Sequence, residues 1–423
     1  GKIRLERLGY FKEVNVETIP VPGTDDQIDI VYSVEEETTG SIGGNIGYSD
    51  FGLMLGFNLQ EQNFMGSGNT VGIGINKNVY SEMYNISYMN PYATRDGVSL
   101  GYNFYYRETD YGEFNVANYL TNSNGFGAQF GYPISDITRL GFNITYDKTD
   151  IDIGSLPARE IYDFVSVEGN LFETLTAQLS WQRVTLNRGL FPTDGASTVL
   201  SVSSTIPGSD LSYYRLNVRQ RYYQPLTKDL VFGFQGELGY LDAYGDTKEV
   251  PFFQNFYAGG PRSLRGFESN TLGPRSTDAP CYEFNYSEGI CPNLLDSDGD
   301  GELDTPYYNP YANQTSRYRD APIGGNIKVE GSLQLIFRLP FIEDQRSLRS
   351  AFFFDFGNVF SDNCKDYQIN CYKPAIDDLR YSYGVGITWI TGFGPMSLAI
   401  AKPTNAGPRE RTEEFQFTVG NVF

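Results

Sequence analysis

The sequence predicts an all-β protein, a 16-stranded antiparallel transmembrane β-barrel, on three observations. Apolar and polar side chains alternate along many segments of ~10 residues, and turns separate these segments. The 423 residues include Tyr 32, Phe 30 and Gly 46, yet the mean hydropathy is −0.36, and no run approaches the ~20 apolar residues of a membrane helix. The chain ends in mid-strand on an aromatic residue, and closing a barrel is the simplest way to pair such an edge.

Residues 1–37 differ from the rest and predict the C-terminal part of a truncated α/β domain. Lys2–Phe11 has the pattern of a helix that ends near Gly9, and strands are expected at Val14–Ile19 and Gln27–Val34. A turn rich in Pro, Gly and Asp lies between the two strands, and a short linker follows them. The first residues do not have the pattern of a signal peptide, so we expect a fragment of a longer protein.

Residues 38–423 carry the period-2 pattern of the barrel. Clear examples are Arg139–Asp147, Tyr214–Tyr222 and Arg380–Trp389, and counting such segments gives sixteen strands, an even number as in bacterial barrels. Short turns alternate with long connections, which places both termini on the periplasmic side. The long connections are expected near 109–122, 149–172, 243–325, 361–378 and 404–412.

Charge and composition exclude several functions. The net charge of −20 argues against a nucleic-acid partner, because binding phosphates needs Lys and Arg. The chain has no histidine, which excludes Ser-His-Asp and Cys-His catalysis and any His-ligated metal centre. We therefore expect a protein that is not an enzyme and that requires no cofactor.

The four cysteines form two close pairs, Cys281 with Cys291 and Cys364 with Cys371, each in a polar, turn-rich stretch. Such pairs predict local disulfides in an oxidising compartment. A Cys₄ metal site is the alternative, but neither pair has the spacing of a metal finger.

A short acidic stretch predicts either a structural calcium ion or a solvated acidic turn. Its carboxylates occupy positions 1, 3, 5 and 9 of a calcium-binding pattern, and a glycine occupies position 6. Position 12 is Tyr307 instead of the bidentate Glu, so the stretch is not a complete EF-hand loop. The candidate ligands are Asp296, Asp298, Asp300 and Asp304.

The connection at 243–325 is far longer than the ~12–15 residues expected of an unstructured loop, so it must have its own fold. Its segment Pro251–Pro274 contains Arg265, Gly266 and Phe267. This segment resembles the signature loop of the BamA family, the central subunits of the outer-membrane β-barrel assembly machinery. The stretches 187–195 and 205–210 and the terminal strand agree, and the N-terminal tail resembles the end of the POTRA domain nearest the barrel.

The loop is expected to fold inward, because its cluster of Phe and Tyr side chains needs burial. An arginine inside a barrel needs a partner, since an unpaired buried charge is very costly. Asp355 lies on the non-aromatic face of its strand, and the resemblance implies that it pairs with Arg265. The resemblance also implies a second acidic partner on the preceding strand, but the matching position here is Gln334. Glu330 lies on the same face of that strand, ~13 Å further along. The sequence leaves open which of the two acts.

The first and last barrel strands predict a weak seam. Gly40–Tyr48 has four glycines in nine residues, which weakens the strand and its register, although close packing is another reason for glycine. The terminal strand Phe415–Phe423 would meet it to close the barrel. The seam residues are Gly40, Gly43, Gly44, Gly47, Phe415, Phe417, Gly420 and Phe423.

The resemblance implies that this seam opens laterally in an integral protein of a Gram-negative outer membrane, with the POTRA side in the periplasm. An incoming barrel precursor would then pair with the free edge and be inserted. Implied partners are unfolded outer-membrane protein precursors, accessory assembly lipoproteins, lipopolysaccharide and phospholipid. Two alternatives are a polypeptide transporter of the two-partner secretion type from the same superfamily and a passive porin.

Overall fold

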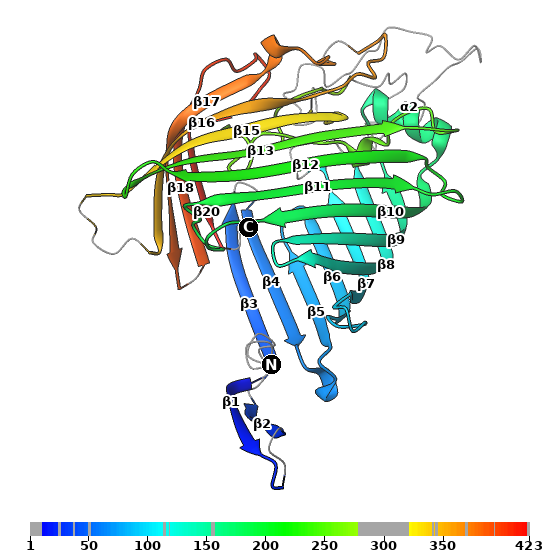
Figure 1. Cartoon of the computed structure of the whole chain (residues 1–423). Coiled ribbons are helices and arrows are strands. Elements are labelled where there is room, and N and C mark those ends of the chain that lie inside the picture. The colour runs from blue at the N-terminus through cyan, green and yellow to red at the C-terminus, as the bar shows by residue number, and fades with distance from the viewer. Residues whose placement is uncertain are drawn as a thin grey trace.

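The computed structural model of the chain contains a closed antiparallel barrel of sixteen strands (Figure 1). The structure describes residues 11–23, 27–36, 39–49, 52–112, 116–117, 119–153, 157–277, 321–340, 342, 346–368, 371–392 and 394–420. None of the helices in these ranges has the length and apolar character needed to cross a membrane. The barrel strands are β3 (Gly40–Ser49), β4 (Gly52–Glu61), β5 (Thr70–Lys77), β6 (Ser81–Asn90), β7 (Ser99–Asp110), β8 (Leu120–Ser135), β9 (Thr138–Asp152), β10 (Leu171–Val184), β11 (Gly195–Thr205), β12 (Tyr213–Pro225), β13 (Leu230–Ala243), β15 (Ile327–Phe337), β16 (Leu348–Phe360), β17 (Arg380–Thr391), β18 (Gly394–Pro403) and β20 (Phe415–Val419).

The N-terminal residues form a separate two-stranded sheet of β1 (Phe11–Pro20) and β2 (Ile28–Glu36). Both expected strands are present, each longer than predicted, and Val14 pairs with Val34. In Figure 1 this sheet lies beyond the end of β3 where the barrel begins. The helix expected at the start of the chain falls on residues 1–10, outside the described residues, apart from Phe11, which begins β1. The assignment of residues 1–37 to a truncated POTRA domain stays a prediction.

Alternation along the strands sorts side chains between the two faces of the barrel wall. On β16, Phe352 and Phe354 are 55% and 39% exposed on the outer face, while Ala351, Phe353 and Asp355 are buried on the inner face. Successive side chains of a strand point to opposite faces, so an apolar outer band can contact lipid while the inner face carries polar groups.

Most of the predicted long connections are present, but connection length does not alternate strictly along the chain. Residues 136–137 and 226–229 form short turns close to the expected positions, and β18 begins three positions after the end of β17. Near the N-terminus, β4 begins at Gly52 soon after β3 ends at Ser49, and β6 begins at Ser81 soon after β5 ends at Lys77, whereas longer connections follow β4 and β6. The remaining elements lie mostly in these longer connections: α2 (Arg159–Glu168), the 3₁₀ turns η1 (Phe64–Gly66), η3 (Phe252–Gln254) and η4 (Ile376–Asp378), and the short strands β14 (Gly266–Phe267) and β19 (Thr412–Glu413).

The described part of the long loop between β13 and β15 supplies much of the hydrophobic core. Its Phe252, Phe256, Leu264 and Phe267 are buried in one cluster with Phe164 of α2 and other apolar side chains. Phe253 and Tyr257 are partly buried against the same cluster. The aromatic cluster of the loop is therefore removed from water, as its composition predicted.

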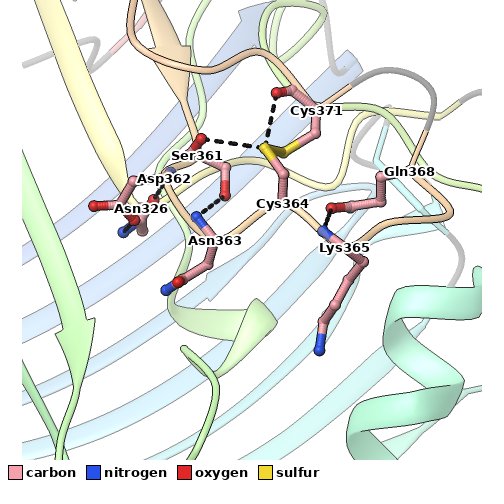
Figure 2. Close-up of a disulfide and its surroundings, with 8 residues drawn as sticks. All are labelled: Asn326, Ser361, Asp362, Asn363, Cys364, Lys365, Gln368 and Cys371. Atoms are coloured by element: carbon pink, nitrogen blue, oxygen red, sulfur yellow. Dashed lines mark hydrogen bonds between the residues drawn. A yellow bond between two sulfur atoms is a disulfide. The ribbon is translucent and has the colours of Figure 1, made fainter.

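A disulfide joins Cys364 and Cys371 in the connection between β16 and β17, as predicted (Figure 2). Their Cα atoms are 5.6 Å apart, within the usual range for a disulfide, so the short spacing presents no geometric obstacle. Beside it, the Asn326 amide donates to Asp362 at 2.6 Å, which ties this connection to the start of β15. Cys281, Cys291 and the acidic stretch 296–304 lie outside the described residues.

Candidate functional site

The barrel closes through a very short pairing between its first and last strands. β20 pairs with β18 over five positions, but with β3 at a single position, where Val419 faces Tyr48. β3 in turn pairs with β4 at all ten of its positions. Within the described residues, the edge of β3 from Gly40 to Gly47 therefore has no strand partner on the side of β20.

The glycines of β3 serve two different purposes. A Cβ atom on Gly43 would meet nothing within 4 Å, and one on Gly44 would meet only the Gly56 carbonyl at 3.9 Å. Gly47 differs, because its Cα lies 2.6 Å from the place where a Cβ on Gly420 would stand. Close packing therefore explains Gly47 and Gly420 at the contact point, whereas Gly43 and Gly44 lie where a side chain would fit.

The structure describes the last strand as far as Val419, where β20 ends, and Gly420 forms a bend instead of continuing the predicted strand. Gly420 has φ +96°, in the left-handed region that favours glycine, and its N–H donates to the Pro395 carbonyl at 3.0 Å. The chain thus turns at Gly420, and Phe423 lies outside the described residues.

Arg265 of the long loop lies against Asp355 of β16 inside the barrel wall. Its Nε and Nη2 atoms donate to the two carboxylate oxygens at 2.7 Å each, and its backbone N–H donates to Oδ2 at 3.2 Å. Asp355 is fully buried, and the Arg265 side chain is 17% exposed. The guanidinium carbon also lies 3.4 Å from the ring centroid of Phe353. A bidentate, charge-assisted pair with a cation–π contact is among the strongest polar arrangements available to a side chain.

The second partner of Arg265 is neither of the two residues considered from the sequence. Nη2 of Arg265 donates to the Ser332 hydroxyl at 2.9 Å, whereas the Gln334 side-chain amide donates to the same hydroxyl at 3.3 Å. The reason is register: Ser332 is the cross-strand neighbour of Asp355, while Gln334 is opposite Phe353. Pairing between β15 and β16 would have revealed Ser332, but a single sequence does not contain that register.

Glu330 also contacts the long loop, but not at Arg265. Its Oε2 accepts a hydrogen bond from the Ser263 hydroxyl at 2.5 Å, and its Oε1 lies 3.0 Å from the Lys328 ammonium. The loop is therefore anchored to β15 on both sides of Leu264, by Ser263 and by Arg265.

The tip of the loop also reaches the last hairpin of the barrel. β14, which consists of Gly266 and Phe267, pairs with β19. Gly266 has φ +89°, and a Cβ there would come within 3.1 Å of Ala401 on β18. The side chain of Gln416 on β20 accepts from the Gly266 N–H at 3.3 Å and donates to the Phe267 carbonyl at 2.8 Å.

Two features around this hairpin were not predicted from the sequence. One is the contact of Gln416 with the loop tip, and the other is an ion pair between Arg380 and Glu410. Nε of Arg380 donates to the Glu410 carboxylate at 2.6 and 2.8 Å, and both side chains are buried. Glu410 also accepts from the Gly407 N–H at 2.7 Å, so the pair holds the connection that carries β19. A polar residue at an inward position of the terminal strand was the one available signal for Gln416.

Comparisons with known proteins place the barrel in a family. Residues 63–423 match the model of the Omp85 superfamily domain. The chain belongs to the Omp85 superfamily. It is 29% identical to the outer membrane protein assembly factor BamA of Neisseria meningitidis over 450 aligned residues, which cover 100% of this chain and 52% of the relative. The chain thus spans about half the length of that relative.

Solved structures agree with the Omp85 assignment. BamA from Haemophilus ducreyi lacking POTRA domains 1–3 superposes with a TM-score of 0.81 at 29% identity, covering 99% of this chain and 77% of that one. CdiB from Escherichia coli has a TM-score of 0.58 at 11% identity, covering 98% of this chain and 69% of that one, which shows a shared fold alone. The fold and these relatives identify an integral protein of a Gram-negative outer membrane.

Proposed function

We propose that this Omp85 chain is the membrane part of an outer-membrane protein assembly factor, which folds and inserts β-barrel precursors through the seam between β3 and β20. The observation that carries the proposal is that, among the residues the structure describes, β3 and β20 pair at a single position, against ten between β3 and β4. The likeness to BamA over the whole chain supports it.

The chemistry of the seam is that of an exposed sheet edge. Backbone N–H and C=O groups cannot stay unpaired in lipid, where water does not reach them. A precursor strand that pairs with the edge of β3 would satisfy these groups by β-augmentation. Exchanging one set of main-chain hydrogen bonds for another costs little net free energy, so insertion needs neither a catalytic residue nor a nucleotide. We accordingly propose no enzymatic activity.

The partners follow from the same proposal. Unfolded outer-membrane protein precursors are the substrates. The outer face of the seam contacts the surrounding lipopolysaccharide and phospholipid. Accessory assembly lipoproteins would act from the periplasmic side, where we propose that the β1–β2 sheet is the end of a POTRA domain.

Depletion of the protein tests the proposal against its rivals. For an assembly factor, unrelated barrels should disappear from the outer membrane when the protein is depleted. A transporter of the two-partner secretion type would instead lose one secreted polypeptide while other barrels remain. A passive porin would lose only solute conductance, so the persistence of other barrels after depletion would overturn the proposal.

A further inference from the structure

The tip of the long loop contacts three neighbouring parts of the barrel through consecutive residues. Arg265 holds β15 and β16, whereas Gly266 and Phe267 hold β19 and the Gln416 side chain of β20. The Gln416 amide offers one acceptor and one donor to two successive backbone groups of the tip. It therefore takes the place that the backbone of a pairing strand would occupy.

Burial alone does not explain these two hydrogen bonds. Thr418 lies on the same face of β20 and is as buried as Gln416, at 2% exposure each. Within the described residues, however, the Thr418 hydroxyl has no hydrogen-bond partner. The two bonds of Gln416 therefore distinguish it from its neighbour on the same face of the strand, which makes no contact of this kind with the loop tip.

β20 is attached along its whole length to β18 but hardly at all to β3. It pairs with β18 over five positions and with β3 at one, whereas β17 pairs with β18 over ten. Because the ladder with β18 leaves the β3 side of this strand weakly held, the two side-chain hydrogen bonds to a tip that Asp355 holds in place are a second constraint on the position of β20.

We propose that Gln416 is a positioning residue, a latch through which the Arg265–Phe267 tip keeps β20 in register with β3. This deepens the proposed function, on which its consequence for precursor insertion rests. When the latch is closed, the ordered tip holds the closing strand. When it opens, β20 leaves Tyr48, and the edge of β3 becomes available over its whole length.

Spin labels on cysteines at Tyr48 and Val419 measure the latch directly in the full chain in lipid bilayers. Gln416→Met removes both hydrogen bonds to the tip, and the longer 3.5 Å bond to Glu413, with little change in volume. The ratio of in-register to displaced molecules should then fall roughly tenfold, as expected for losing two neutral hydrogen bonds. Thr418→Val is the matched control and should leave the distance distribution unchanged. An unchanged distribution in Gln416→Met, or an equal change in both variants, would overturn the latch.

Gln416→Glu separates a hydrogen-bonding role from packing. A protonated carboxyl group accepts and donates at the same positions as the amide, whereas a carboxylate loses the donor and faces the Phe267 carbonyl and Glu413. The in-register population of this variant should be normal near pH 4.5 and reduced near pH 8, and the unaltered protein should be the same at both pH values. No difference between the two pH values would count against the latch, even if Gln416→Met does not fold.

Assembly of precursor barrels by the same variants separates the two proposals. If the label distances change as expected but assembly proceeds at full rate, the result supports the latch and contradicts insertion through the seam. If the distances between the spin labels do not change, the result contradicts the latch at any rate of assembly.

Discussion

Removal of the Arg265 side chain should be among the most damaging single changes in the barrel. Arg265→Ala deletes two hydrogen bonds of 2.7 Å to a fully buried carboxylate, the 2.9 Å bond to Ser332 and the contact with Phe353. Asp355 would keep only the 3.2 Å bond from the backbone N–H at position 265. Leaving a buried charge without its partner costs about 3–5 kcal/mol of unfolding free energy.

Related variants show which part of the pair carries this cost. Arg265→Lys keeps the charge but loses the planar fork, so we expect roughly half of the effect of alanine. In Asp355→Asn combined with Arg265→Ala, no charge is left unpaired. The double variant should therefore be more stable than the sum of the two single changes predicts, by about 1–3 kcal/mol.

Equilibrium unfolding in denaturant, with the protein in lipid vesicles, measures these free energies, and hydrogen exchange of the loop amides reports whether the tip leaves the barrel. If Arg265→Ala unfolds within about 1 kcal/mol of the unaltered protein, with loop protection intact, the pair behaves like an exposed ion pair. The reasoning from burial would then be wrong.

The other predictions concern the seam, the cysteines, α2 and the acidic stretch. A disulfide between cysteines at Tyr48 and Val419, which face each other in the ladder, should block precursor assembly until reductant is added; full activity with the crosslink formed would remove lateral opening from the mechanism. Cys364→Ser should leave the barrel melting temperature nearly unchanged, because the bridge closes only a short loop. Mass mapping of the unaltered protein without reductant should find bridges 364–371 and 281–291. Crossed pairs or free thiols would contradict the expected pairing. Burial raises the pKa of Glu160, against the opposing effect of the Thr277 hydrogen bonds, so the protonated form is favoured in the folded state. The contribution of this group to stability is present below its unfolded pKa and is lost as pH rises through the raised folded pKa. Protection of α2 amides should decrease over that range, and Glu160→Gln should remove this dependence; equal pH profiles in both proteins would count against it. If the stretch 296–304 binds calcium, Asp298→Asn should abolish a calcium-dependent stabilisation of the full chain, and the absence of any calcium effect favours the solvated turn.

The local pattern of the sequence determined the architecture, because a strand with one face toward lipid or core must alternate. The β16 segment shows this clearly: the outward Phe352 and Phe354 and the inward Asp355 were readable from spacing alone. The same reasoning predicted sixteen strands, the positions of the long connections and the inward fold of the aromatic loop. The pairing of Cys364 with Cys371 followed from spacing and context.

Register, backbone turns and contacts between distant segments were decided only by the tertiary structure. Ser332 is a partner of Arg265 because β15 and β16 pair with Ser332 opposite Asp355, and a shift of two residues would have placed Gln334 there. The short pairing at the seam depends on how Gly47 and Gly420 approach each other across the whole length of the chain. Gln416 acts on the loop tip across 149 residues of sequence. Such contacts arise from closure of the barrel, which no local pattern of side chains encodes.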